Sequence, residues 1–293
     1  MKSKTHNLFI LLVLFIFIIF QKAPYSQSEK IENLFNNLEG LDKAAQRDYI
    51  EKILNKIGDE DINIAKKHTE QLLKITSGFG DLYCYIMTLI FYSRYGSLNE
   101  KMEVCYSAHN LVMDYGDDYL TANSFDALAE KYQLKEQYDS ALICVLKSRD
   151  LFNGLGLKEK EVTSIHKMAD IFYHTGLYDK AEKLYREIMI IKGDNKAWNE
   201  WRKYVITNNL GLIENKRMNY NKAFEYFQTA LNNLFAERIF VLNNGDSVRM
   251  VNSYLLLTDA SINKNNINQA KDYLEKLIAL NAIVRWTSYN KSM

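Results

Sequence analysis

The side chains that most often carry catalysis or bind metals are scattered along this chain of 293 residues. No two of its five histidines are four residues apart and no His-Glu-x-x-His motif occurs, so the sequence does not indicate a zinc site. Neither a glycine-rich phosphate-binding loop nor a Gly-x-Ser-x-Gly elbow is present. Adjacent carboxylates such as Asp117 and Asp118 suit the positive end of a helix dipole. The sequence therefore predicts a protein that is not an enzyme and needs no cofactor or metal.

The three cysteines, Cys84, Cys105 and Cys144, show no spacing typical of a metal site or a redox motif. We expect them to be small buried hydrophobic residues. A bridge between Cys84 and Cys105 stays open as an alternative, because an exported chain can form disulfides.

The elements that position these residues are revealed by a motif that recurs four times. Its copies are Tyr138–Ala141, Tyr178–Ala181, Tyr220–Ala223 and Ile267–Ala270, and their alanines are 40, 42 and 47 residues apart. Recurrence at such a period indicates an array of helical repeats. The composition agrees, since one proline and 12 glycines in the whole chain favour long helices with short turns.

A second small residue stands twelve positions before each of these alanines. The four are Ala129, Ala169, Gly211 and Thr258. Two helices that cross closely need small side chains at the crossing point, so each repeat is predicted to be a helical hairpin. Larger apolar residues recur around each pair at helical spacing.

This pattern resembles the tetratricopeptide repeat (TPR) family, most closely in Asn209-Leu210-Gly211 followed by Tyr220–Ala223. The resemblance implies an all-α fold, a right-handed superhelix (α-solenoid) of antiparallel helix pairs. It departs from the family at Glu214, where an aromatic residue is usual, and at Thr258 and Ser261. We expect a degenerate N-terminal helical pair at 29–80, a TPR-like array of about five hairpins at 81–281, and a C-terminal tail at 282–293.

The N-terminus reads as a secretory signal peptide. Two lysines precede an unbroken apolar run of 13 residues, Leu8 to Phe20, and small residues follow. As a helix this run would span about 20 Å, less than the roughly 30 Å of a bilayer core. We therefore expect residues 1–26 to be cleaved after Ser26 and the protein to be exported to the periplasm or cell envelope. An uncleaved anchor, the one expected contact with a membrane, stays open as the alternative.

The charges exclude one class of partner and the resemblance suggests another. With 37 basic and 36 acidic residues, the chain lacks the basic stripe expected of a nucleic-acid-binding protein. In TPR proteins the first helix of each hairpin lines a concave groove, and the resemblance assigns its outward side chains to the second, fifth, ninth and twelfth positions. In this chain they are Asn123, Asp126, Glu130 and Gln133, then Thr163, His166, Asp170 and Tyr173, then Val205, Asn208, Leu212 and Asn215, and finally Asn252, Leu255, Asp259 and Ile262.

We expect ten of these to form the partner site: Asn123, Asp126, Glu130, Gln133, His166, Asp170, Tyr173, Asn208, Asn215 and Asp259. Their amides suit an extended peptide backbone, whereas ordinary solvated helix surface is the alternative. Because acidic residues occur in this set without a group of lysines, a basic or neutral peptide is favoured over a C-terminal carboxylate.

Two hypotheses of function follow. In the first, the protein is an exported scaffold that binds a protein or peptide in the groove and performs no chemistry. In the alternative, it is a periplasmic sensory module, a shortened or stand-alone relative of a histidine kinase or helix-turn-helix regulator of the Bacteroidetes type. The oligomeric state is left open.

Overall fold

The computed structural model describes residues 31–291, except for 59, 80–81, 194–195 and 237–243. The expected signal peptide lies outside the described residues. The described part of the chain is folded into thirteen helices and no strand. The helices are α2 (Ile31–Glu39), α3 (Lys43–Gly58), α4 (Ile62–Ser77), α5 (Leu82–Tyr92), α6 (Leu98–Tyr115), α7 (Asp118–Leu134), α8 (Tyr138–Gly154), α9 (Lys158–His174), α10 (Tyr178–Met189), α11 (Lys196–Lys216), α12 (Tyr220–Ala236), α13 (Asn244–Asn263) and α14 (Ile267–Lys291).

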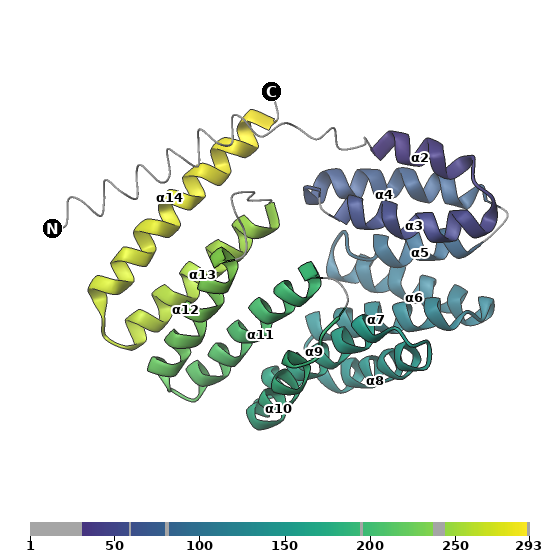
Figure 1. Cartoon of the computed structure of the whole chain (residues 1–293). Coiled ribbons are helices and arrows are strands. Elements are labelled where there is room, and N and C mark those ends of the chain that lie inside the picture. The colour runs from purple at the N-terminus through teal and green to yellow at the C-terminus, as the bar shows by residue number, and fades with distance from the viewer. Residues whose placement is uncertain (1–30, 59, 80–81, 194–195, 237–243, 292–293) are drawn as a thin grey trace.

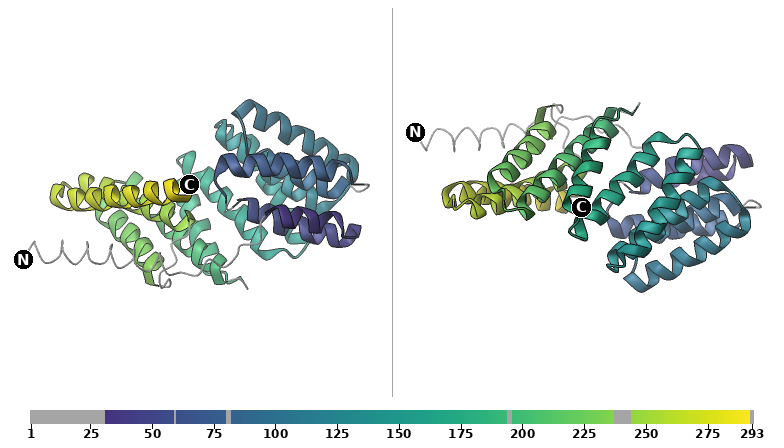
Figure 2. Two further views of the ribbon diagram at one scale, coloured as in Figure 1. Left: turned by 90° about the horizontal axis from the view of Figure 1, so that it is seen from above. Right: turned by 90° about the horizontal axis from the view of Figure 1, so that it is seen from below.

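From α5 onward the helices form antiparallel hairpins that stack side by side (Figure 1). Each hairpin consists of a first helix (α5, α7, α9, α11 or α13) and the second helix that follows it. Successive hairpins rotate relative to one another, as the two views of Figure 2 show. This confirms the predicted all-α fold, a right-handed superhelix of antiparallel helix pairs.

The two ends of the array differ from the sequence-based division. The sequence predicts one helical pair over 29–80, whereas three helices occupy 31–77, because the turn at 40–42 separates α2 from α3. Asp42 starts α3, since its Oδ1 accepts a hydrogen bond from the Ala45 N–H (2.9 Å). The tail expected at 282–293 is helical as far as Lys291, because no glycine or proline interrupts residues 267–291.

The turn inside each of the last four hairpins has one geometry. A residue with positive φ lies two positions before each motif: Glu136 (φ 57°), Gly176 (78°), Met218 (64°) and Asn265 (56°). The next N–H donates to the carbonyl five residues earlier, at 2.8–2.9 Å, as in Leu177 to Phe172 and Asn219 to Glu214. This is the hydrogen bond that closes helices in a left-handed cap. The same turn therefore connects the two helices in all four hairpins, although only one of the four positive-φ residues is a glycine.

The small residues lie where the helices of a hairpin cross. Ala129, Ala141, Ala169 and Ala181 are completely buried. Gly211 shows the reason, because a Cβ atom at this position would lie 2.5 Å from Cε1 of Phe227 on the second helix. The recurring alanines are therefore packing residues, and Tyr138 and Tyr178 pack against the same cores. The large side chains beside them join consecutive hairpins, as where Tyr185 of α10 packs with Ile206 and Leu210 of α11.

Candidate functional site: the first-helix surface

The ten residues expected to bind a partner all lie on the first helices α7, α9, α11 and α13. We call the sixteen side chains at the second, fifth, ninth and twelfth positions of the four repeat units, as named above, the first-helix surface. On α7, α9 and α11 these side chains are half-buried, and Asn208 is buried, because the next first helix packs beside them. On α13 all four, Asn252, Leu255, Asp259 and Ile262, are exposed.

Between α7 and α9, two lysines bond to predicted site residues. Lys160 Nζ donates to Asn123 Oδ1 (3.2 Å), and Lys167 Nζ lies 2.6 Å from Asp126 Oδ2. Lys160 also stands over the Tyr119 ring, 4.8 Å from its centroid, where a cation is attracted by the π face. Burial lowers the pKa of Lys160, opposed by the charges of Glu51 and Asp126. These contacts hold two successive first helices together.

Between α9 and α11, Asp170 is the centre of a second polar cluster. Tyr185 Oη donates to Asp170 Oδ1 (2.5 Å), and Asn209 Nδ2 donates to the same oxygen (3.2 Å). His166 Nδ1 lies 3.4 Å from Asp170 Oδ2, and its Nε2 is 3.2 Å from Asn209 Nδ2. Burial, together with the charge of Asp170, raises the pKa of Tyr185 above its ordinary value. The phenol therefore stays protonated and donates to the carboxylate.

Between α11 and α13, two asparagines and Asp259 form a third polar cluster. Asn215 Nδ2 donates to Asp259 Oδ2 (3.2 Å) and Asn263 Nδ2 donates to Asn215 Oδ1 (3.4 Å). Tyr204 Oη donates to the Arg249 carbonyl (2.8 Å). The structure thus brings most of the predicted residues into three polar clusters, each between neighbouring first helices. Gln133 and Tyr173 lie apart from these clusters, and the Tyr173 ring packs on Tyr178 (5.8 Å between centroids).

Two side-chain oxygens of this surface accept no hydrogen bond from the described residues. Asp126 Oδ1 and Asn208 Oδ1 are buried and have no hydrogen-bond partner within the described residues. Glu130 differs from them, because its side chain is 46% exposed while its Oε1 lies 3.1 Å from Lys131 Nζ. Glu130 therefore offers an accessible acceptor that suits an N–H group of an extended backbone, whereas the oxygens of Asp126 and Asn208 are enclosed by the protein.

Two lysines of α9 lie beside the acidic surface expected from the sequence. Lys160 and Lys167 lie outside the four positions that the TPR register assigns to the surface, and so they were missed. The sequence does contain a signal for these two lysines. They are seven residues apart, which places them on one face of a helix. They also follow their partners Asn123 and Asp126 by 37 and 41 residues, which is close to the repeat period.

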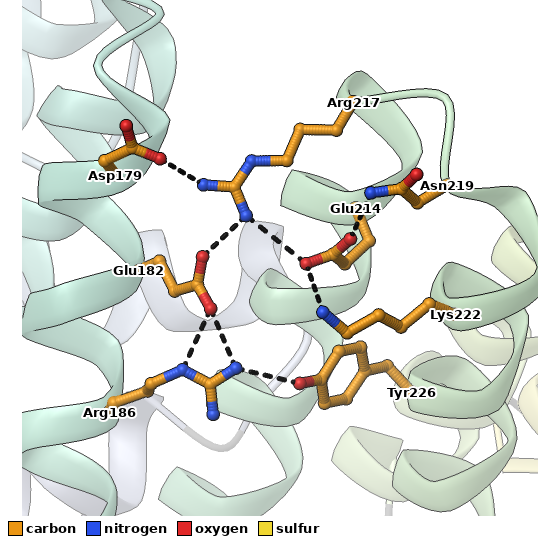
Figure 3. A network of polar contacts seen from close by, with 8 residues as sticks. All are labelled: Asp179, Glu182, Arg186, Glu214, Arg217, Asn219, Lys222 and Tyr226. Carbon is orange, nitrogen blue, oxygen red and sulfur yellow. Dashed lines mark hydrogen bonds and ion pairs between the residues drawn. The ribbon is translucent and has the colours of Figure 1, made fainter.

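A separate ion network fastens α10 to the fourth hairpin (Figure 3). Arg217 reaches Asp179 and Glu182 on α10, at 2.5 Å each, and Glu214 on its own helix at 3.3 Å. Glu214 is 2% exposed and also accepts from Asn219 Nδ2 (2.8 Å) and Lys222 Nζ (2.9 Å). The departure from the TPR pattern at Glu214 therefore has a structural reason, because a buried carboxylate here collects three donors.

Other kinds of site lack support in the described ranges. Histidine, cysteine and acidic side chains in these ranges nowhere gather in groups of three that could hold a metal ion. Cys84, Cys105 and Cys144 are buried, as expected. Among the described residues, no helix combines the length and the apolar character needed to cross a bilayer.

Comparison with known proteins places the fold in one class, the TPR-like α-solenoids. No protein-family model matches the sequence, and no curated protein matches it. The chain is similar to a solved Rap protein complexed with Competence and Sporulation Factor (TM-score 0.60, 13% identity, 86% of this chain and 75% of that chain). NprR in complex with its cognate peptide NprX matches with a TM-score of 0.58 and 14% identity over 99% of this chain and 86% of that chain. BtubC (BKLC) from P. vanneervenii matches with a TM-score of 0.57 and 15% identity over 75% of this chain and 91% of that chain.

Proposed function

We propose that this protein is an exported, non-enzymatic scaffold that binds a protein or peptide along the first-helix surface. The observation that carries the proposal is the row of amide and carboxylate side chains on successive first helices, of which Glu130, Asn252 and Asp259 are accessible to a partner. The TPR resemblance assigns this surface to the concave side of the superhelix. Two proteins of similar fold were solved with a peptide or factor bound, which supports this kind of partner.

The chemistry of the surface narrows the partner. Asp126 is paired with Lys167, and Asp170 accepts hydrogen bonds from Tyr185 and Asn209, so both carboxylates already have partners within the protein. Asn252 and Asp259 on α13 are exposed, and Glu130 on α7 is half exposed. The partner is therefore an extended peptide segment, neutral or basic, whose backbone N–H groups meet these oxygens.

Site-specific photo-crosslinking tests the surface. A photoreactive phenylalanine is placed at Asn252 or Gln133 on first helices, and at Ile143 on α8 as the control. Ile143 is 57% exposed and Gln133 is only half-buried, so the absence of a crosslink from Ile143 could not be due to poor access. We expect one protein or peptide to be crosslinked in the cell envelope from Asn252 and Gln133 but not from Ile143.

Charge reversal then tests the chemistry. Glu130→Lys with Asp259→Lys should reduce the yield of that crosslink at least tenfold, because a basic or neutral peptide loses its acceptors. The control, Glu103→Lys with Asp139→Lys, reverses two exposed acidic residues on the second helices α6 and α8 and should leave the yield unchanged. Equal crosslinking from Ile143 and Asn252, or equal loss in both charge variants, would place binding elsewhere.

Export has its own test. We expect the chain recovered from the periplasmic fraction to begin at Gln27, so that its intact mass lacks residues 1–26. The physical reason is that the apolar run is too short to span the bilayer as a stable anchor. A membrane-bound chain that retains Met1 would show instead that the segment is an uncleaved anchor.

The sensory module is the second candidate. It shares the first-helix surface and differs in the identity of what is bound, so crosslinking also distinguishes the two. A sensor kinase or transcription regulator among the crosslinked proteins would favour the sensory module.

A further inference from the structure

The side chains of the first-helix surface are not equally accessible to a partner. On α7 and α9, several of its polar groups are used in contacts between helices, such as Asn123 with Lys160 and Asp126 with Lys167. On α13, by contrast, all four side chains of the surface are exposed. A partner therefore meets the most accessible part of the surface on α13, beside α11.

The four exposed side chains of α13 alternate in character along the helix. Asn252 and Asp259 are polar, whereas Leu255 and Ile262 are aliphatic and are 49% and 50% exposed. The steps between neighbouring members of this set are three or four residues, so all four lie on one face of the helix. This face therefore presents hydrogen-bond acceptors and aliphatic groups in turn.

Two apolar side chains of α11 extend this face. Trp201 and Val205 are four residues apart and half-buried, and the Trp201 ring lies beside His166 of the first-helix surface, with 6.3 Å between the centroids. In the described part of the chain, neither these two nor Leu255 and Ile262 belong to the hydrophobic cores of the hairpins. We call Trp201, Val205, Leu255 and Ile262 the apolar track.

Hydrogen bonds set α11 and α13 in register. Tyr204 Oη donates to the Arg249 carbonyl (2.8 Å), and Asn215 Nδ2 donates to Asp259 Oδ2 (3.2 Å). The two track residues of α11 therefore lie level with the turn that follows Arg249, and Leu255 lies about one turn further along. The apolar track thus runs obliquely from α11 to α13, with the acceptors of α13 beside it.

We propose that the apolar track selects the partner, and that the bound segment is an extended peptide with large aliphatic or aromatic side chains at alternate positions. This inference rests on the proposed function and names the side chains that the site reads. Successive side chains of an extended chain point to opposite sides, so alternate residues face the protein together. They contact the apolar track, while backbone N–H groups of the peptide donate to Asn252 and Asp259.

Spacing and polarity favour a peptide over other occupants. Trp201 and Val205 are about 6 Å apart along α11, and alternate residues of an extended chain are separated by about 7 Å. A lipid tail or a purely apolar protein face would cover Asn252 and Asp259 without offering them donors, which costs free energy. An extended peptide supplies both kinds of group, because its N–H donors recur between its side chains along the whole segment.

Selection from a random peptide library tests which side chains are read. The full chain is immobilised, and ten-residue peptides displayed on phage are selected for binding. We expect enrichment of peptides that carry apolar residues at two or more alternate positions. The strongest binder is then synthesised with a fluorescent label, and its affinity for the chain and its variants is measured by fluorescence polarisation.

Two matched pairs of substitutions show whether the apolar track makes the contact. Leu255→Ser with Ile262→Ser should weaken binding of that peptide at least tenfold, because two apolar contacts are lost. Met113→Ser with Ile143→Ser, at residues that are 58% and 57% exposed on the second helices α6 and α8, should leave the affinity unchanged. Thermal unfolding should be the same in both pairs, since all four residues are exposed.

A substitution in the peptide completes the comparison. Replacing its alternate apolar residues with serine should weaken binding less in Leu255→Ser with Ile262→Ser than in the unsubstituted chain, because the contact is already lost there. Additive losses, or equal losses in the two serine pairs, would overturn the inference. A dimer of the full chain that dissociates in Leu255→Ser with Ile262→Ser would overturn it as well, by identifying a second copy as the occupant.

The outcomes also separate this inference from the proposed function. Selected peptides without alternate apolar residues, whose binding is lost in Glu130→Lys with Asp259→Lys but not in Leu255→Ser with Ile262→Ser, would overturn the inference and support the proposed function alone. Failure to select any peptide, or equal binding to all the variants, would contradict both.

Discussion

Replacing Glu214 with leucine lowers the free energy of unfolding by about 2–3 kcal/mol, the expected result for a buried carboxylate that accepts three hydrogen bonds. Its donors, Arg217, Asn219 and Lys222, lose a shared acceptor, and leucine cannot replace it. The loss is smaller than for a fully buried pair, because the side chains of Arg217 and Lys222 are 25% and 52% exposed and can be solvated.

Urea unfolding of the two proteins measures this difference. Glu225→Leu on α12 is the matched control, since Glu225 is exposed, and its expected change is within about 0.5 kcal/mol. If Glu214→Leu and Glu225→Leu unfolded alike, the ion network of Figure 3 would not contribute to the fold.

The same carboxylate makes stability depend on pH. Burial tends to raise the pKa of Glu214, but hydrogen bonds from Lys222 and Asn219 outweigh it and lower the pKa below 4.5. The pKa of Glu182 is lowered in the same way, against burial, by Arg217 and Arg186. A carboxyl group with a depressed folded pKa stabilises the fold above its unfolded pKa and loses this effect as the pH falls through the folded value. Stability should therefore fall below about pH 4.5, and less steeply in Glu214→Gln.

Replacing Gly211 with leucine should destabilise the fourth hairpin by about 3 kcal/mol. A Cβ atom there meets Cε1 and Cδ1 of Phe227 at 2.5 and 2.7 Å, and the Phe227 side chain is completely buried in a packed core. Overpacking of this kind costs about 1–3 kcal/mol, occasionally more. Alanine should cost less, because the clash is partly offset by the roughly 1 kcal/mol that alanine gains over glycine in a helix.

A double variant shows whether the Phe227 ring is the cause. Phe227→Leu in the Gly211→Ala background should recover part of the lost stability, which a double-mutant cycle from urea unfolding measures as a coupling energy. Additive effects of the two substitutions would mean that Gly211 is not required by the crossing of α11 and α12.

Much of the fold could be predicted because its determinants are local. The small residues at Ala129, Ala169 and Gly211 with their partners twelve positions later define the crossing of each hairpin. The helix start at Ser97 is also local, with a capping box in which the Ser97 N–H donates to Glu100 (2.6 Å). By contrast, the shared left-handed turn is invisible at Glu136 and Met218, because neither residue type prefers positive φ.

The candidate site could be predicted only in part. The TPR register placed Asp126, His166 and Asp170 on the first helices, and the structure agrees. It did not show that Lys167 neutralises Asp126 or that Tyr185 and Asn209 bond to Asp170. These partners come from a neighbouring repeat or from the second helix, and their distance depends on the angle between helices.

The sequence by itself determined the repeat and its register, since a close helix crossing demands small residues at a fixed spacing, and that demand is met within each hairpin. Only the tertiary structure decided which polar groups pair across hairpins and which aliphatic residues stay exposed. The reason is that one position, such as that of Tyr185 and Leu274 four residues after the motif alanine, is buried or exposed according to whether another hairpin follows it. Whether a side chain in a repeat array is buried depends on the adjacent repeats, and the sequence of one repeat does not specify those repeats.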